Sequence, residues 1–155
     1  MSLETQPTAK PADLCTCSHD SGVAVWKQLL VTYLKMQRRV EEMLTPYGLV
    51  LSQFEALAKI GLKPGIIQQE LVAVLLVTKG NVGALLDRLE SIGLVERQSD
   101  PNDRRANRLH LTQPGEQMVA EIFQKHCALV REMLQPLDPQ QRQTLQSLLK
   151  MLEPA

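Results

Sequence analysis

Apolar residues recur every three to four positions along most of this chain, the spacing of amphipathic helices. Residues 94–98 and 107–111 depart from this spacing: they are short, contain Val and Leu, and read as two strands joined by a turn. The helical pattern predicts helices over about 21–45, 52–60, 67–75, 78–91, 113–135 and 139–152.

Polar residues, Gly and Pro support these boundaries. Ser52 with Glu55 three residues later has the spacing of a capping box, in which side chains at a helix start satisfy free backbone N–H groups. Gly48 suits the end of the first helix, because glycine readily adopts the left-handed conformation of a C-terminal cap. Thr78, Thr112 and Asp138 are the expected N-caps of the last three helices, and Pro136 ends the fifth.

The two strands enclose the turn DPNDRR at residues 100–105, which gives a β-hairpin with arginines at its tip. Helices followed by such a hairpin form a winged helix-turn-helix, so we expect a mainly α-helical fold with a small β-hairpin (α+β). The expected lobe covers about residues 50–112, and helices for dimerisation cover about 21–45 and 113–153. Residues 21–155 would form one domain, preceded by a flexible tail over residues 1–20 that has no periodic pattern.

Composition changes this picture little. Hydrophobic residues make up 44% of the chain and aromatic residues only 3%, which favours a helical core of aliphatic side chains. The formal net charge is zero, so any nucleic-acid binding must depend on where the charges lie. The longest uncharged apolar run, Leu71 to Thr78, is too short to span a bilayer, and no signal-peptide pattern is visible. We therefore expect a cytoplasmic protein that does not contact a membrane.

The helix beginning near Thr78 presents residues suited to a DNA major groove. Asn can pair with adenine, and Lys can reach guanine or a phosphate. The arginines of the turn suit a minor groove, although a solvated charged turn is the commoner fate of such runs. Thr78 could equally serve only as a cap, and Gln68, Gln69 and Arg88 could be solvated surface residues. The candidate DNA-binding residues are Gln68, Gln69, Thr78, Lys79, Asn81, Val82, Arg88, Asp103, Arg104, Arg105 and Arg108.

In combination, several short motifs resemble those of the MarR family of bacterial transcription regulators. They are LSQFEAL at 51–57, QEL at 69–71, VTKGNV at 77–82, LLDRLE at 85–90, GLVER at 93–97 and DPNDRR at 100–105. The resemblance covers about residues 25–152. It implies a homodimer that binds a pseudo-palindromic operator in double-stranded DNA, usually as a repressor. It also implies that Asp100 or Asp103 holds one of the three arginines between positions 104 and 108 while another enters the groove.

The same resemblance implies release of DNA by a small, often anionic aromatic effector bound in a crevice. Trp26, Tyr33, Arg38 and Tyr47 could line that crevice, or they could be ordinary core and surface residues.

The cysteines raise a different form of control. Cys15, Cys17 and His19 are possible metal ligands, with His126 or Cys127 as a fourth, but their spacing is tighter than that of structural zinc sites, and incidental thiols in a tail are the simpler interpretation. We therefore expect no bound metal and no cofactor. Some members of the family resembled here respond to oxidation, and Cys127 could form a disulfide with Cys15 or Cys17.

No catalytic motif is present: the chain has no Gly-rich phosphate loop, no HExxH and no GxSxG. An enzyme is therefore the least favoured class, and we assign no catalytic residue. The alternative from another class is a winged-helix module that binds proteins without specific DNA recognition.

Overall fold

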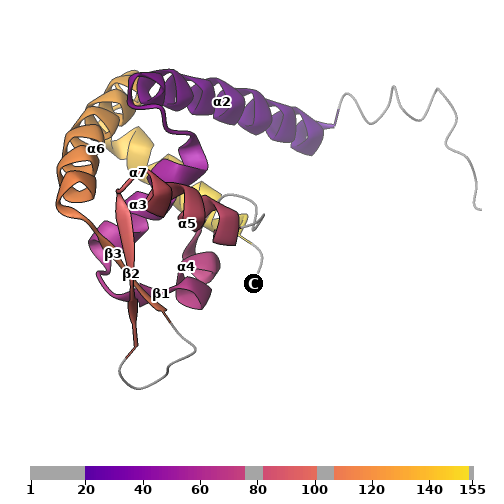
Figure 1. Ribbon diagram of the computed structural model, residues 1–155. Helices are drawn as coiled ribbons and strands as arrows, with labels where there is room; N and C mark the ends of the chain where they lie inside the picture. The colour runs from indigo at the N-terminus through magenta and orange to yellow at the C-terminus, as the bar shows by residue number, and fades with distance from the viewer. Residues whose placement is uncertain (1–19, 76–81, 101–106, 154–155) are drawn as a thin grey trace, which may run out of the picture. The chain divides into compact units, whose positions relative to one another are not determined.

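The structure is a computed structural model that describes residues 20–75, 82–100 and 107–153. Figure 1 shows the elements along the chain, and two units are distinguished, residues 1–39 and 40–155. The elements are α2 (Ser21–Leu44), the 3-10 helix η1 (Thr45–Tyr47), α3 (Leu51–Leu62), β1 (Ile66–Ile67), α4 (Gln68–Val74), α5 (Val82–Ser91), β2 (Val95–Ser99), β3 (Asn107–Leu111), α6 (Gln113–Met133) and α7 (Pro139–Met151).

In the first unit, the described residues form most of α2. The helix begins after Asp20, whose carboxylate oxygen Oδ1 accepts hydrogen bonds from the backbone N–H groups of Gly22 (2.7 Å) and Val23 (3.1 Å). These two bonds satisfy donors that would otherwise lack a partner in the first turn. Large apolar side chains are exposed along this part of the helix, namely Val25, Trp26, Leu30, Val31, Tyr33 and Leu34.

The second unit begins with the end of α2. Gly48 follows η1 with a φ of 65°, and its N–H donates to the carbonyl of Thr45, which confirms the expected glycine cap. The predicted capping box at Ser52 is wrong, because α3 begins one residue earlier and Val50 precedes it. Gln53 makes the return contact instead: its Oε1 accepts a hydrogen bond from Val50 N–H at 3.1 Å.

The sheet has three antiparallel strands in the order β1–β3–β2. Val95 pairs with Leu111 and Ser99 with Asn107, so the predicted hairpin is confirmed and β3 has the predicted bounds. The third strand was not predicted. Ile66 and Ile67 pair with Leu109 and Arg108, which shortens the helix expected from residue 67. The overall class, mainly helical with a small sheet, is confirmed.

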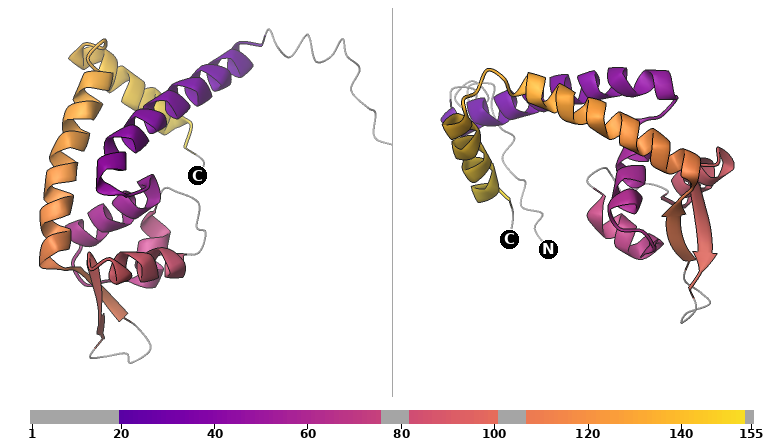
Figure 2. Two further views of the ribbon diagram at one scale, coloured as in Figure 1. Left: turned by 45° about the horizontal axis from the view of Figure 1, so that its top comes forward. Right: turned by 90° about the vertical axis from the view of Figure 1, so that its left-hand side faces the viewer.

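One apolar cluster unites the helices and the sheet of this unit. Its fully buried members come from every layer: Leu57 and Ile60 from α3, Leu86 and Leu89 from α5, and Ile122 from α6. Figure 2 shows β2 and β3 as a two-stranded ribbon that starts beside the N-terminal end of α6. The core therefore holds the hairpin against α3 and α6, which is the arrangement that a wing requires.

The last two helices begin at the predicted N-caps. Thr112 Oγ1 accepts a hydrogen bond from Gly115 N–H at 3.1 Å. Asp138 and Gln141 form a reciprocal capping box at 2.8 and 2.9 Å. No residue of α7 is buried, although Leu145, Leu148, Leu149 and Met151 lie on it. Among the described residues, no helix combines the length and the apolar character needed to span a membrane.

Candidate functional site

The helix-turn-helix is formed by α4 and α5, which both pack on the core. On α4, Leu71 is fully buried, while Gln68 and Gln69 in the first turn are exposed. On α5, Leu86 and Leu89 are buried and Arg88 is exposed on the opposite side. The exposed residues include three of the predicted DNA-binding positions, so these side chains are accessible to a partner.

Glu70 orients the start of α4. One of its carboxylate oxygens accepts a hydrogen bond from Lys63 Nζ at 2.8 Å, and the other accepts from Ile67 N–H at 3.2 Å. The hydrogen bond from Lys63, followed by that from the Ile67 backbone, lowers the pKa of Glu70 below its usual value. This carboxylate thus links the turn after α3 to the helix that begins at Gln68.

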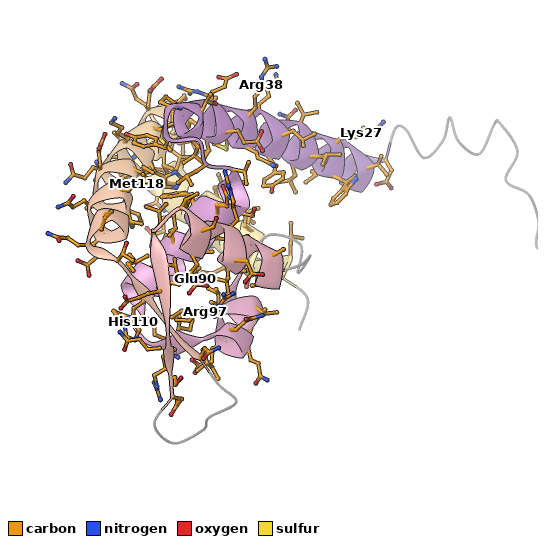
Figure 3. All side chains as sticks on the ribbon, in the orientation of Figure 1. Lys27, Arg38, Glu90, Arg97, His110 and Met118 are labelled. Carbon is orange, nitrogen blue, oxygen red and sulfur yellow. The ribbon has the colours of Figure 1, made fainter. Side chains whose placement is uncertain are left out.

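Arg97 on β2 pairs with two carboxylates of α5. Its guanidinium lies 2.7 Å from Asp87 Oδ1 and 2.5 Å from Glu90 Oε2, and Figure 3 labels Glu90 and Arg97. Burial by itself would lower the pKa of Arg97, but the hydrogen bond to Asp87 and the charges of both carboxylates raise it above its usual value. The arginine therefore stays charged and connects the wing to α5. Sequence reasoning missed this role, because nothing in the sequence links residues 7 and 10 positions apart on different elements.

A second ion pair lies at the end of the wing. Asp100 is buried, with 8% of its side chain exposed, and its Oδ2 lies 2.7 Å from Arg108 Nη2. Arg108 Nη1 also lies within 3.4 Å of the Gly65 carbonyl oxygen, in the turn before β1. Asp100 therefore holds an arginine, as the resemblance implied for Asp100 or Asp103. The arginine is Arg108, in β3.

The other predicted DNA contacts fall into two groups. Val82 is only 7% exposed and packs in the core, so its side chain is withdrawn from any surface contact in this conformation. The remaining predicted positions lie outside the described residues, namely Thr78, Lys79, Asn81, Asp103, Arg104 and Arg105.

The residues predicted to line an effector crevice belong to both units. Trp26 and Tyr33 are 65% and 57% exposed on α2, and Arg38 is exposed on the same helix. Tyr47 donates a hydrogen bond to Glu121 Oε1 at 2.6 Å, and Lys125 Nζ lies 2.8 Å from the same oxygen. The hydrogen bond from Lys125, then that from Tyr47, lowers the pKa of Glu121. Tyr47 is thus part of a polar network with α6.

The described residues give little support to a redox or metal-binding role for the cysteines. Cys15, Cys17 and His19 lie outside them, and Cys127 is a half-buried free thiol on α6. The ring of His126 packs edge-on against Phe54 with centroids 5.4 Å apart, and burial lowers its pKa. Within the described ranges, no group of three or more His, Cys, Asp or Glu side chains could hold a metal ion.

Comparison with known proteins places this lobe among bacterial regulators. Residues 49–106 match the MarR family. The multiple antibiotic resistance protein MarR of Escherichia coli K12 is 34% identical over 121 residues, which are 77% of this chain and 84% of that protein. The uncharacterised regulator YkoM of Bacillus subtilis is 33% identical over 82 residues, and this match spans 53% of each chain.

Among solved structures, a cysteine-to-serine variant of Escherichia coli MarR complexed with operator DNA superposes with a TM-score of 0.77. The two sequences are 32% identical, and the match covers 85% of this chain and 95% of that one.

Proposed function

The chain belongs to the MarR family of transcription regulators, and from this premise we propose that it is a homodimer that binds a specific pseudo-palindromic DNA operator. We propose further that it is a cytoplasmic repressor that a small-molecule ligand releases from DNA. The observation that carries the DNA-binding proposal is the pairing of Arg97 with Asp87 and Glu90. The single positive charge of Arg97 offsets one of the two negative charges on a helix that would otherwise repel phosphates more strongly.

The pairing matters because the charge balance of the lobe is narrow. Residues 78–108 hold six basic and five acidic side chains, an excess of one. Two of the acids are engaged by Arg97 and a third by Arg108. Outside these ion pairs the same range holds four basic and two acidic residues, and the exposed Arg88 is one of the four.

We assign base recognition to the N-terminal end of the recognition helix α5 and to the residues that precede it in the sequence. In helix-turn-helix proteins this end enters the major groove. Asn81 can bond adenine, and Lys79 can reach a guanine edge or a phosphate. Arg104 and Arg105 at the tip of the wing would enter the adjacent minor groove, where a narrow A·T tract concentrates negative potential. Gln68 and Gln69 on α4 would contact the phosphate backbone.

The dimer proposal is supported by apolar side chains that the described residues leave exposed. On α7, Leu148 is 55% exposed, and Leu152, directly after the helix, is 64% exposed. On α2, Trp26 and Leu34 are 65% and 53% exposed. If a second copy of the chain covered these side chains, each Å² of apolar surface removed from water would stabilise the dimer by about 25 cal/mol. A pseudo-palindromic site would match the two-fold symmetry of this dimer.

The test measures the salt dependence of binding to a duplex selected from a random-sequence pool. Each phosphate contact that is lost reduces the slope of log K against log salt by about 1. We expect Arg104→Ala to weaken binding and to reduce the slope by about 1 per half-site.

Arg131→Ala is the matched control, because it removes the same charge from an exposed position in the last turn of α6. It should leave the slope unchanged. Equal slopes for Arg104→Ala and the unaltered protein would refute the role given to the wing, and failure to select any shared sequence would refute specific binding.

A further inference from the structure

A cavity of about 480 Å³ opens between α3, β3 and α6 of the second unit. None of the predicted effector or DNA-binding residues lines it. The lining residues that matter here are Gly61, His110, Leu111, Glu116, Ala120 and Phe123.

The size and the walls of the cavity suit a small organic molecule. Ligand sites usually enclose about 300–1,000 Å³ and combine apolar walls with a few polar groups. Here the walls are mainly aliphatic, and they include the side chain of Phe123, which is 44% exposed. Gly61 lets Leu111 pack directly on α3, because a Cβ at position 61 would come within 3.1 Å of Leu111 Cδ1, and Leu111 forms part of the wall. An aromatic ring could therefore pack against Phe123 and Leu111.

The charge of the lining restricts the ligand further. Glu116 is the lining residue with a formal charge at neutral pH, and the set contains no Lys or Arg. Glu116 lies in the first turn of α6. His110 and Gln124 add hydrogen-bonding groups. A carboxylate beside an aromatic wall favours a cation over an anion of the same shape.

We propose that this cavity binds an amphipathic organic cation, an aromatic amine whose rings lie among the apolar walls and whose ammonium group pairs with Glu116. Its charge preference is opposite to that of the anionic effectors implied by the family resemblance.

The cavity also touches the base of the wing. His110 and Leu111 belong to β3, which pairs with both β1 and β2. Gly61 and Pro64 lie where α3 leads into β1. A bound molecule would therefore contact the end of β3, the strand that pairs with both other strands of the sheet. The effect of the bound amine on DNA affinity rests on the proposed function, whereas the binding of the amine to the cavity does not.

The experiment is isothermal titration calorimetry of the full chain with three probes that share one ring system: 2-naphthylmethylamine, 2-naphthylmethanol and 2-naphthylacetate. At neutral pH they are a cation, a neutral alcohol and an anion. We expect affinity to decrease in that order. Glu116→Gln should weaken the amine about two- to fivefold, the range for an exposed ion pair, and should leave the alcohol unchanged.

Ala120→Leu fills the cavity from α6 and should weaken all three probes at least tenfold. Ala128→Leu, the same substitution at another exposed position of the same helix, should not. Thermal unfolding and light scattering verify that each variant folds and keeps its assembly state. Equal or tighter binding of the anion, unchanged affinity in Ala120→Leu, or no binding of any probe would each overturn the proposal.

A separate measurement isolates the regulatory consequence. The amine is titrated into the complex of protein with its selected duplex, and the DNA affinity is compared between the unaltered protein and Ala120→Leu. We expect the amine to change the DNA affinity only in the unaltered protein. A protein that binds the amine but never binds DNA would support the cavity and refute the proposed function. A protein that binds DNA but not the amine would support the proposed function and refute the proposed cavity ligand.

Discussion

Gly115→Ala tests how closely α6 is packed against the start of β2. Gly115 is buried in the first turn of α6, and a Cβ built on it would lie 2.1 Å from the carbonyl oxygen of Leu94. The N–H of Thr112 donates to the same oxygen at 3.1 Å, and Thr112 Oγ1 donates to the Gly93 carbonyl at 2.5 Å. Glycine at position 115 thus lets the start of α6 approach the Leu94 carbonyl closely enough for these hydrogen bonds to form.

The magnitude follows from the required movement. The backbone must separate by at least 0.9 Å to lengthen the contact from 2.1 to 3.0 Å, the shortest that real Cβ atoms show. Such overpacking costs about 1–3 kcal/mol, and weakening the Thr112 hydrogen bond costs about 0.5–1.5 kcal/mol. The better helix propensity of alanine offsets up to about 1 kcal/mol. The free energy of unfolding should therefore fall by about 2 kcal/mol, which lowers the Tm by about 4–8 °C in a chain of this size.

The assay is thermal unfolding followed by circular dichroism at one fixed protein concentration, since a dimer's Tm depends on concentration. Gly61→Ala is the matched control, because it makes the same change within a helix. There the new Cβ meets the flexible end of Leu111 at 3.1 Å, and not backbone. The control should change the unfolding free energy by less than about 1 kcal/mol in either direction. A Tm for Gly115→Ala equal to or above that of the unaltered protein would refute the reasoning.

Two further substitutions test the electrostatics. Arg97→Gln leaves Asp87 and Glu90 of α5 without their partner, so the DNA affinity should fall and the free energy of unfolding should drop by about 1 kcal/mol. A triple variant that also carries Asp87→Asn and Glu90→Gln should recover DNA binding. Failure to recover would show that charge is not the cause. Because of His126, the protein should become less stable as the pH falls. Burial lowers the pKa of His126 in the folded chain, so below the usual histidine pKa of about 6.5 the unfolded chain binds a proton that the folded chain does not. Denaturant unfolding at about pH 7.5 and about pH 5.5 should therefore show a smaller difference for His126→Phe, and an equal difference would contradict the assignment.

Local rules predicted the parts of the fold that depend on neighbouring residues. Thr112 and Asp138 were expected as caps from their side chains and the following turn, and both accept the expected backbone hydrogen bond. The start of α3 was misplaced because Gln53 supplies the contact that Ser52 and Glu55 were expected to make. A helix start with an apolar N-cap residue and a Gln three residues later is harder to recognise in a sequence than one with Ser and Glu at the same spacing.

Features that depend on distant residues were missed. Ile66 and Ile67 were read as leading into a helix, because a two-residue strand has no periodicity of its own and its partner lies 43 positions further on, at Leu109. The role of Arg97 was missed for the same reason. Gly115 was overlooked because the packing that requires glycine involves the carbonyl of Leu94, which leaves no trace in the local sequence.

The candidate site shows the same division. The exposure of Gln68, Gln69 and Arg88 agrees with the face expected from helical periodicity. Val82 was predicted as a DNA contact, but its side chain completes the core beneath the helix. An apolar residue at the start of a helix can face either the core or a partner, and tertiary packing decides between the two.

The central claim is specific recognition of DNA, and the most direct test is selection of genomic DNA fragments on the purified protein followed by sequencing. The account predicts recovery of one pseudo-palindromic site, with half-sites about one helical turn apart, and loss of that site with Asn81→Ala. Recovery of fragments that share no sequence, or the same recovery with Asn81→Ala as with the unaltered protein, would contradict it.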